Sequence, residues 1–273
     1  MSLIGSSGKS GSFFFYSANY KYMIKSISKH EFITLRRILK NLYNHYQQNK
    51  ETLLCKLFGL HKLKTYKNNK KTSTIIICVM NNVFEGQCNL DMIFDLKGSK
   101  YKREKGQKES KDAPFKDLDF LRRDIKISLE KKYLNKITNQ LEKDSDFLSK
   151  CRINDYSVLI GIKFSFNLES DENKFKSMNF FETFSNEKND LNKRPVAYLC
   201  HNTVIKKLKK NQGKKGEEIE LYIGIIDILT GFGFKKNLEY RFKRAICGKD
   251  ISCIPPKNYS ERFLEFMKKF VFD

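Results

Sequence analysis

The sequence has 273 residues, which is enough for one large domain or two lobes with a substantial hydrophobic core. Hydrophobic residues make up 40% of the chain and aromatic residues 13%, which excludes a disordered protein. The formal net charge of +22 indicates an anionic partner: nucleic acid is the commonest, and a phosphate-rich ligand or an acidic membrane are the alternatives.

The cysteine and histidine patterns exclude two classes of small stabilised domain. The seven cysteines are scattered without a CxxC pair, which favours reduced cytoplasmic thiols over a disulfide framework or a zinc ribbon. The four histidines share no metal-ligand spacing. No signal peptide and no apolar stretch of about 20 residues is present, so we expect any membrane contact to be peripheral.

The first elements in chain order are two strands and a helix. Aromatic and β-branched runs predict strands at residues 12–16 and 20–27, separated by a turn at 17–19. Ser28, followed three residues later by Glu31, forms a capping box and predicts the start of a helix. Apolar residues at helical spacing predict that this helix packs one face on a sheet (Phe32, Leu35, Leu39, Leu42, Tyr43 and Tyr46).

Two further strands are predicted after this helix, near residues 53–63 and 74–83, with a polar loop at 65–72 between them. Strands, one helix and then more strands, without regular alternation, favour an antiparallel sheet. The predicted fold class is therefore α+β.

The second half of the chain mixes loops with helical and strand patterns. Residues 97–116 are basic and polar and predict a loop, and residues 124–150 have a helical pattern. Two polar segments, 167–193 and the lysine-rich 206–215, predict surface loops. A strand is predicted at 220–229.

The chain ends in a predicted helix. Asn258 and Glu261 have the spacing of a capping box, and Pro255 and Pro256 precede them. The helix carries an apolar stripe (Phe263, Phe266, Met267, Phe270 and Val271).

The amino-terminal glycines suggest a turn rather than a P-loop. Residues 7–10 imitate the end of that motif, but Leu3 stands where it needs glycine, and a strand follows instead of a helix. Gly8 to Gly11 therefore form a turn between two strands, either lying over the phosphates of a nucleotide or serving as an ordinary hairpin turn.

Lys25 lies on the strand that follows this turn and precedes a helix bearing Glu31. Kinases use this arrangement to grip the α- and β-phosphates of ATP, and the alternative is a solvent-facing strand lysine. For Glu31 the capping role is favoured over a pair with Lys25.

Three further residues have the chemistry that phosphoryl transfer needs. The turn in Asp95–Ser99 presents Lys97 and backbone amides to phosphate, or is a plain surface loop. Asp155 and Asp227 each lie in an apolar stretch, where a carboxylate is costly without a cation or a metal. One carboxylate to orient a hydroxyl and one to hold Mg²⁺ would suffice for such a site. A single buried acid is often structural, but two in matching contexts favour the functional interpretation.

The segment after Asp227 is rich in basic and aromatic residues (Phe232, Phe234, Lys235, Lys236, Leu238, Arg241, Phe242, Lys243 and Arg244). These residues suit an anionic and partly apolar surface. A metal-binding acid beside such a segment suggests chemistry on a lipid head group.

These motifs resemble those of the phosphatidylinositol phosphate kinases, most closely the type I phosphatidylinositol-4-phosphate 5-kinases. The matching stretches run almost end to end in the order of the family: SGSFFFY, YMIKSI, TLLCKLFGLHKL, VMNNVF, FDLKGSKYKR, FKDLDF, NDYSVLIGI, LYIGIIDIL and YSERFLEFM. The resemblance implies a bilobal kinase-like fold of the SAICAR synthase/PIP-kinase type with antiparallel sheets. It implies a nucleotide-binding lobe at 1–82 and a catalytic lobe at 83–273, including a specificity loop at 228–253.

The same resemblance implies roles for individual residues. ATP would be bound by a glycine loop, a phosphate lysine and the linker between the lobes (Gly8, Gly11, Lys25, Val79, Met80, Asn81 and Lys97). Asp155 is similar to the catalytic aspartate and Asp227 to the Mg²⁺ ligand. The lipid and the membrane would meet the specificity loop (Lys235, Lys236, Leu238, Glu239, Arg241 and Lys243). Glu239 matches the glutamate of the 5-kinases, whereas the type II 4-kinases carry a small residue there.

The implied activity is transfer of the ATP γ-phosphate to the 5-hydroxyl of phosphatidylinositol 4-phosphate. The implied location is the cytosolic face of a membrane, the plasma membrane, without nucleic acid as a partner. The alternative from another class is a catalytically impaired phosphoinositide- or nucleic-acid-binding module.

Three features depart from the family pattern. Asn154 stands where the animal family usually has Met, and Asn237 replaces the second lysine of the specificity loop, with Lys235 as a substitute. The chain also begins at the nucleotide loop, whereas the family has an upstream segment that completes the sheet and supports dimer contacts. We therefore expect a truncated catalytic fragment whose homodimer contacts belong to that upstream segment.

Overall fold

The computed structural model describes residues 2–4, 12–68, 70–84, 90–106, 113–164, 197–201, 217–233 and 254–273. These residues form two five-stranded antiparallel sheets together with helices, which confirms the predicted α+β class. None of the helices within these ranges is both long and apolar enough to cross a membrane.

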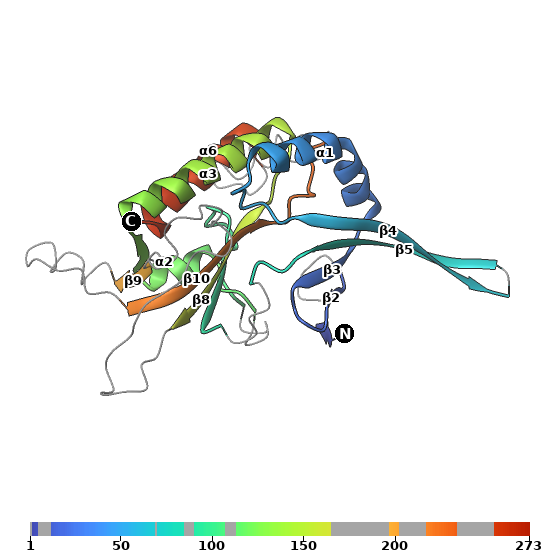
Figure 1. Cartoon of the computed structure of the whole chain (residues 1–273), viewed down its shortest axis with the longest axis horizontal. Coiled ribbons are helices and arrows are strands. Elements are labelled where there is room, and N and C mark those ends of the chain that lie inside the picture. Colours follow the sequence, from blue (N-terminus) through green and yellow to red (C-terminus); the bar gives the residue numbers. More distant parts are fainter. Residues whose placement is uncertain are drawn as a thin grey trace, which may run out of the picture.

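The first sheet has the strand order β1-β2-β3-β5-β4. Its strands are β1 (Ser2–Ile4), β2 (Phe14–Tyr16), β3 (Tyr22–Ile27), β4 (Leu57–Lys67) and β5 (Lys70–Asn81). The register pairs Lys25 with Phe14 on one side and with Cys78 on the other, so these three side chains share a face of the sheet. Strands β4 and β5 form a long hairpin that extends away from the rest of the molecule (Figure 1).

Two predictions in this region are wrong. Residues 65–67 and 70–72 do not form a loop but continue strands β4 and β5, with the Thr65 hydroxyl hydrogen-bonded to those of Thr72 and Ser73. Threonines suit a strand as well as a loop, so polarity alone was misleading there. Residues 53–56 lie outside any strand, because β4 begins only at Leu57.

Helix α1 (Lys29–Gln48) begins at Ser28 with the predicted capping box. Its buried residues are Thr34, Leu35, Ile38, Leu42 and His45. Leu39 and Tyr43, which the predicted stripe included, are exposed. Leu35 and Leu42 of the predicted stripe are buried, and Phe32 and Tyr46 pack against the core, so the stripe is confirmed in part. The buried face extends to Ile38 and His45 because the helix also packs on helix α3 (Lys131–Lys150), where the His45 ring stacks on Phe147 with centroids 4.3 Å apart.

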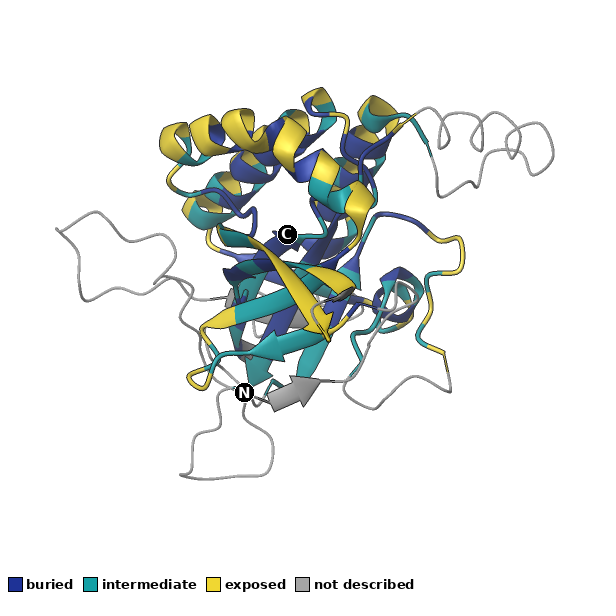
Figure 2. Ribbon diagram, turned by 90° about the vertical axis from the view of Figure 1, so that its right-hand side faces the viewer, coloured by how far each residue is buried: buried dark blue, intermediate teal, exposed yellow. Residues whose placement is uncertain are grey.

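The second sheet has the strand order β6-β8-β10-β9-β7. Its strands are β6 (Met92–Leu96), β7 (Ile125–Leu129), β8 (Ser157–Phe164), β9 (Ala197–His201) and β10 (Glu217–Ile226). Helix α3 runs alongside helix α6 (Pro256–Phe266) above this sheet (Figure 1). Buried residues gather between these helices and the sheet, and the outward helix surfaces are exposed (Figure 2).

The helix predicted at 124–150 begins later than expected. Residues 125–129 form strand β7, which pairs with β9, and helix α3 covers only the remainder. Ile125, Ile127 and Leu129 alternate along the chain and are almost fully buried, a period of two that the helical pattern around them concealed. Asp124, directly before strand β7, has a left-handed backbone conformation with a φ of 50°.

The final helix is confirmed, but its predicted capping box is wrong. Helix α6 begins at Pro256, with Pro255 as its N-cap, so Asn258 lies inside the helix. Proline suits the first helical position because the N–H group that it lacks has no partner there. The apolar stripe is buried at Phe263, Phe266, Met267 and Val271, where the last residues form a π-helical turn (Met267–Val271).

The remaining helix, α2 (Asp117–Arg122), is short and begins within the sequence FKDLDF. The described parts of the predicted loop at 97–116 contain no helix or regular strand. The loops predicted at 167–193 and 206–215 lie outside the described residues.

Candidate active site

Lys25 and Asp227 are in direct contact, although 202 residues separate them in the chain. The Lys25 ammonium on β3 donates a hydrogen bond of 2.8 Å to Oδ1 of Asp227, which directly follows β10. The lysine side chain is 12% exposed and the aspartate side chain 39% exposed. The pair therefore joins the two sheets and remains open to solvent on the aspartate side.

Glu31 combines the two roles that the sequence left open. Its Oε2 accepts a hydrogen bond of 2.7 Å from the backbone of Ser28, as a capping box requires. Its Oε1 lies 3.7 Å from the Lys25 ammonium. The cap is confirmed, and it also brings a second carboxylate close to Lys25.

The charges at this site reinforce one another. Burial acts to lower the pKa of Lys25, but Asp227 and Glu31 outweigh this effect and raise it above the ordinary 10.5. Burial acts to raise the pKa of Asp227, but Lys25, Lys97 and Arg103 outweigh it and lower the pKa below 3.8. Asp227 is therefore an ionised carboxylate at neutral pH, which is the form that binds a cation.

The second sheet brings Lys97, Asp155 and Asp227 to one edge. Ser157 pairs with Ile226 and Val158 pairs with Leu96, so the end of β6, the start of β8 and the end of β10 coincide. The Lys97 ammonium donates a hydrogen bond of 2.7 Å to the backbone carbonyl of Asp155.

Both aspartates have a left-handed backbone conformation, with φ of 62° at Asp155 and 60° at Asp227. This region is uncommon for residues other than glycine, and such strain occurs frequently at functional sites. Each turn redirects the chain at the sheet edge where Lys97, Asp155 and Asp227 lie.

Asp117 organises the loop that carries Lys97, a role that the sequence did not reveal. Its fully buried carboxylate accepts hydrogen bonds from the backbone of Lys97 at 3.0 Å and of Ser99 at 3.2 Å. It also accepts one of 2.7 Å from Nε of Arg103, whose guanidinium reaches Asp95 at 3.0 Å. The motif FKDLDF contains Asp117, but nothing in its local pattern indicated contacts 14 to 20 residues away.

The predicted linker residues Val79, Met80 and Asn81 end strand β5. Met80 pairs with Met23 and faces the same side of the sheet as Lys25, where it is 5% exposed. The Asn81 side chain makes an internal hydrogen bond: its Oδ1 accepts one of 2.7 Å from the backbone N–H of Lys56.

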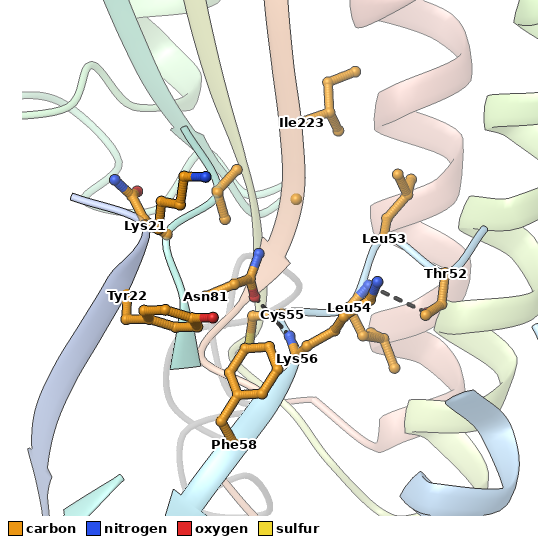
Figure 3. Close-up of a pocket in the computed structure, with 13 residues that line it drawn as sticks. Lys21, Tyr22, Thr52, Leu53, Leu54, Cys55, Lys56, Phe58, Asn81 and Ile223 are labelled. Atoms are coloured by element: carbon orange, nitrogen blue, oxygen red, sulfur yellow. Dashed lines mark hydrogen bonds between the residues drawn. The ribbon is translucent and has the colours of Figure 1, made fainter. Parts of the chain in front are cut away.

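A cavity of about 310 Å³ lies beside this linker (Figure 3). Its lining comes from the start of β3, the segment before β4, the linker and β10 (Lys21, Tyr22, Thr52, Leu53, Leu54, Cys55, Lys56, Phe58, Asn81, Asn82, Val83, Ile223 and Gly224). Strand alternation directs Tyr22 to the sheet face opposite Lys25. Neither Lys25 nor Asp227 is among the residues that line the cavity.

The donors at the sheet edge fit Mg²⁺ better than a transition metal. Within the described ranges no three His, Cys, Asp or Glu side chains cluster as a metal site. Mg²⁺ is usually held by one or two carboxylates together with substrate phosphates, and Asp227 alone meets that need.

Several predicted site residues lie outside the described residues. They are the glycines of the nucleotide loop and the specificity-loop residues (Gly8, Gly11, Lys235, Lys236, Leu238, Glu239, Arg241 and Lys243).

Comparison with known proteins gives a consistent match over the whole chain. The family model described as Phosphatidylinositol-4-phosphate 5-Kinase matches residues 1–270. The phosphatidylinositol 4-phosphate 5-kinase type-1 alpha of Rattus norvegicus is 33% identical over 293 residues, covering 98% of this chain and 51% of the relative.

Two relatives from distant organisms match similarly. Phosphatidylinositol 4-phosphate 5-kinase 3 of Arabidopsis thaliana is 32% identical, covering 97% of this chain and 39% of the relative. The phosphatidylinositol 4-phosphate 5-kinase of Plasmodium falciparum (isolate 3D7) is 31% identical, covering 96% of this chain and 15% of the relative. The chain thus spans about half the length of the animal relative and less of the other two.

Proposed function

The chain belongs to the phosphatidylinositol-4-phosphate 5-kinase family, and we propose that it transfers the γ-phosphate of ATP to the 5-hydroxyl of phosphatidylinositol 4-phosphate. The product would be phosphatidylinositol 4,5-bisphosphate. The observation that carries the proposal is the contact of 2.8 Å between Lys25 and Asp227, which joins a phosphate-binding cation to a metal-binding anion.

In this proposal the chain has the bilobal PIP-kinase fold, with a nucleotide-binding lobe at 1–82 and a catalytic lobe at 83–273. ATP lies between the Lys25 face of the first sheet and the edge of the second. Lys25 binds the phosphates, the residues Val79–Asn81 lie near the adenine, and Gly8 and Gly11 lie over the phosphates. When Mg-ATP binds, Lys25 exchanges Asp227 for a phosphate group as its anionic partner.

Bound Mg²⁺ neutralises negative charge on the β- and γ-phosphates. Asp227 is the residue that would hold it, since its carboxylate is ionised and 39% exposed. Asp155 orients the 5-hydroxyl and accepts its proton. Lys97 binds the transferred phosphate, a role supported by the contact of its ammonium with the Asp155 carbonyl. Electrostatic stabilisation of this kind supplies most of the rate in phosphoryl transfer.

The lipid specificity rests on the loop at 228–253. Its basic and apolar residues dock the protein on an anionic bilayer at the cytosolic face of a membrane (Lys235, Lys236, Leu238, Arg241 and Lys243). Glu239, in the same loop, selects the 4-phosphate lipid. The names of the relatives, all phosphatidylinositol 4-phosphate 5-kinases, support this substrate.

The direct test is a radiolabelled γ-phosphate assay with short-chain phosphatidylinositol 4-phosphate and Mg-ATP. We expect labelled lipid from the wild type and a loss of about 10²- to 10³-fold or more in kcat for Asp227→Asn, because the cation ligand is removed. Asp146→Asn is the control, since Asp146 is exposed on helix α3 and pairs only with Lys150 among the described residues. A folded wild type that binds vesicles without turnover would instead identify a non-catalytic binding module.

A further inference from the structure

Residues 52–56, here called the strap, join three parts of the molecule without forming a helix or a regular strand. All five of their backbone N–H groups donate hydrogen bonds to described acceptors. Such complete pairing in an irregular segment indicates a fixed position rather than a passive connection.

The middle of the strap is hydrogen-bonded to the strand that leads into the site. The Ile225 backbone donates to the carbonyl of Leu53 at 2.6 Å and accepts from the backbone of Cys55 at 2.9 Å. Ile225 precedes Asp227 by two residues, so a shift of the strap moves the strand end that carries this carboxylate. The Cys55 carbonyl is also fixed, by the Tyr46 hydroxyl at 2.7 Å.

The end of the strap is bonded to the linker. Lys56 exchanges two hydrogen bonds with Asn81, through the side-chain Oδ1 at 2.7 Å and the backbone N–H at 3.1 Å. Figure 3 shows the strap residues Thr52 to Lys56 beside Asn81 and Ile223. The strap therefore contacts both the linker and β10.

Asp144 on helix α3 fixes the start of the strap. Its carboxylate is fully buried and accepts four hydrogen bonds: from Thr52 Oγ1 at 2.7 Å, Leu53 N at 2.8 Å, Gln140 Nε2 at 2.8 Å and His45 Nε2 at 2.6 Å. These donors compensate for the loss of hydration of the carboxylate. The Asn49 amide lies 3.3 Å from His45 Nδ1, so the imidazole ring is held between Asn49 and Asp144.

The strap is held by packing and by hydrogen bonds. Leu53, Leu54 and Cys55 are buried in the hydrophobic core, while one side of the strap borders the cavity of about 310 Å³. The hydrogen bonds to Asp144, Ile225 and Asn81 are directional, so they set the strap position more narrowly than apolar contacts alone would.

We propose that Asp144 is a positioning residue for phosphate transfer: through the strap it sets the end of β10 and thereby the position of the Asp227 carboxylate, with or without bound nucleotide. This inference rests on the proposed function, since it concerns the same site. Asp144 itself touches neither Lys25 nor Asp227; its described hydrogen bonds are those to His45, Thr52, Leu53 and Gln140.

The test compares Asp144→Asn with the matched control Asp146→Asn, two residues further along the same helix. Both are assayed at a temperature where circular dichroism finds them fully folded. We expect Asp144→Asn to lower kcat by about tenfold or more, because a small displacement of a catalytic group is costly. We also expect a higher Mg²⁺ concentration for half-maximal rate and an unchanged KM for the lipid. Asp146→Asn should match the wild type in all three.

A second variant covers the case in which Asp144→Asn fails to fold. Thr52→Val keeps the side-chain shape and removes one of the four donors to Asp144, so the same changes are expected in weaker form. A folded variant with wild-type kcat and wild-type Mg²⁺ dependence would overturn the inference.

Calorimetric binding of Mg-ATP without lipid separates this inference from the proposed function. If the wild type makes no labelled lipid, the proposed function fails, but weaker Mg²⁺-dependent nucleotide binding by Asp144→Asn still supports the positioning role. Equal nucleotide binding by the wild type and Asp144→Asn, or no binding by either, contradicts it.

Discussion

At the residue scale, the site is built from charges held in costly positions. Asp155 and Asp227 each occupy a left-handed backbone conformation, which costs on the order of 1–3 kcal/mol for a residue other than glycine. Asp117 and Asp144 are fully buried carboxylates, each satisfied by several donors. Asp155 and Asp227 lie at the edge of the second sheet, whereas the carboxylates of Asp117 and Asp144 hold the segments around that edge by hydrogen bonds.

The Lys25–Asp227 pair predicts how stability depends on pH. The pKa of Asp227 is below its ordinary 3.8, so its contribution is present above pH 3.8 and is lost as the pH falls through the folded pKa. The pKa of Lys25 is above 10.5, so its contribution is present below pH 10.5 and is lost as the pH rises through the folded pKa. The partial exposure of Asp227 keeps both contributions modest.

We therefore expect the free energy of unfolding of the wild type, relative to the double variant Lys25→Met/Asp227→Asn, to be constant across neutral pH and to shrink at both extremes. Urea unfolding at a series of pH values measures this difference. A clear change between about pH 6 and pH 8 would contradict the direction of either pKa shift.

Gly98 gives a second prediction at this scale. Its φ is +66°, and an added Cβ would lie 3.0 Å from the carbonyl oxygen of Arg262 and from the Cα of Phe263. We expect Gly98→Ala to lower the free energy of unfolding by about 2 kcal/mol and to lower kcat, because the loop carrying Lys97 must shift. Gly233→Ala is the control: no atom lies within 4 Å of its Cβ position, so urea unfolding should change by less than about 0.5 kcal/mol. Equal effects at both positions would refute this account of Gly98.

At the element scale, the sequence predicted the elements that have a local signal of their own, such as a capping box or an apolar run. Helix α1 starts at its capping box, and strands β3 and β10 follow their apolar runs. Strand β7 was missed because its short alternation merges with the helical pattern of α3. The start of helix α6 was misplaced because Pro256 at the first helical position competes with a capping-box spacing two residues later.

The capping box of helix α1 separates a structural role from a catalytic one. We expect Ser28→Ala to lower the free energy of unfolding by about 1 kcal/mol, since one cap hydrogen bond is lost, while kcat stays near that of the wild type. Glu31→Gln should show the reverse, because the amide oxygen still accepts from Ser28 while the charge near Lys25 disappears. Thermal unfolding and steady-state kinetics of both variants measure the two effects, and a kcat loss in Ser28→Ala alone would reverse the assignment.

At the scale of the whole molecule, the site depends on contacts that no local pattern encodes. Lys25 and Asp227 come together across 202 residues, and Asp144 reaches a strap more than 90 residues away. The residue patterns left alternatives open for Lys25, Lys97, Asp155 and Asp227. The resemblance to the kinase family assigned them to one site, because the relative positions of these residues are known for the family's fold. The supporting contacts of Asp117 and Asp144 depend on how distant segments pack, so the sequence alone gave no sign of them.

The net charge of +22 gives a prediction for the membrane-bound state. Each surface lysine or arginine near an anionic bilayer contributes about 1 kcal/mol, and salt screens this attraction. We expect binding to phosphatidylserine vesicles in a sedimentation assay to weaken by about tenfold or more between about 0.1 M and 0.5 M salt. Neutral phosphatidylcholine vesicles are the control. Binding that is strong and insensitive to salt would contradict an electrostatic docking surface.

The identity of the phosphorylated product tests the central claim most directly. Wild-type protein is incubated with Mg-ATP and phosphatidylinositol 4-phosphate, and the deacylated product is resolved by chromatography against standards of the 3,4- and the 4,5-bisphosphate. The account predicts the 4,5-bisphosphate from the wild type and about 10²- to 10³-fold less from Asp227→Asn. A product phosphorylated at another hydroxyl, or no product from folded wild-type protein, would contradict it.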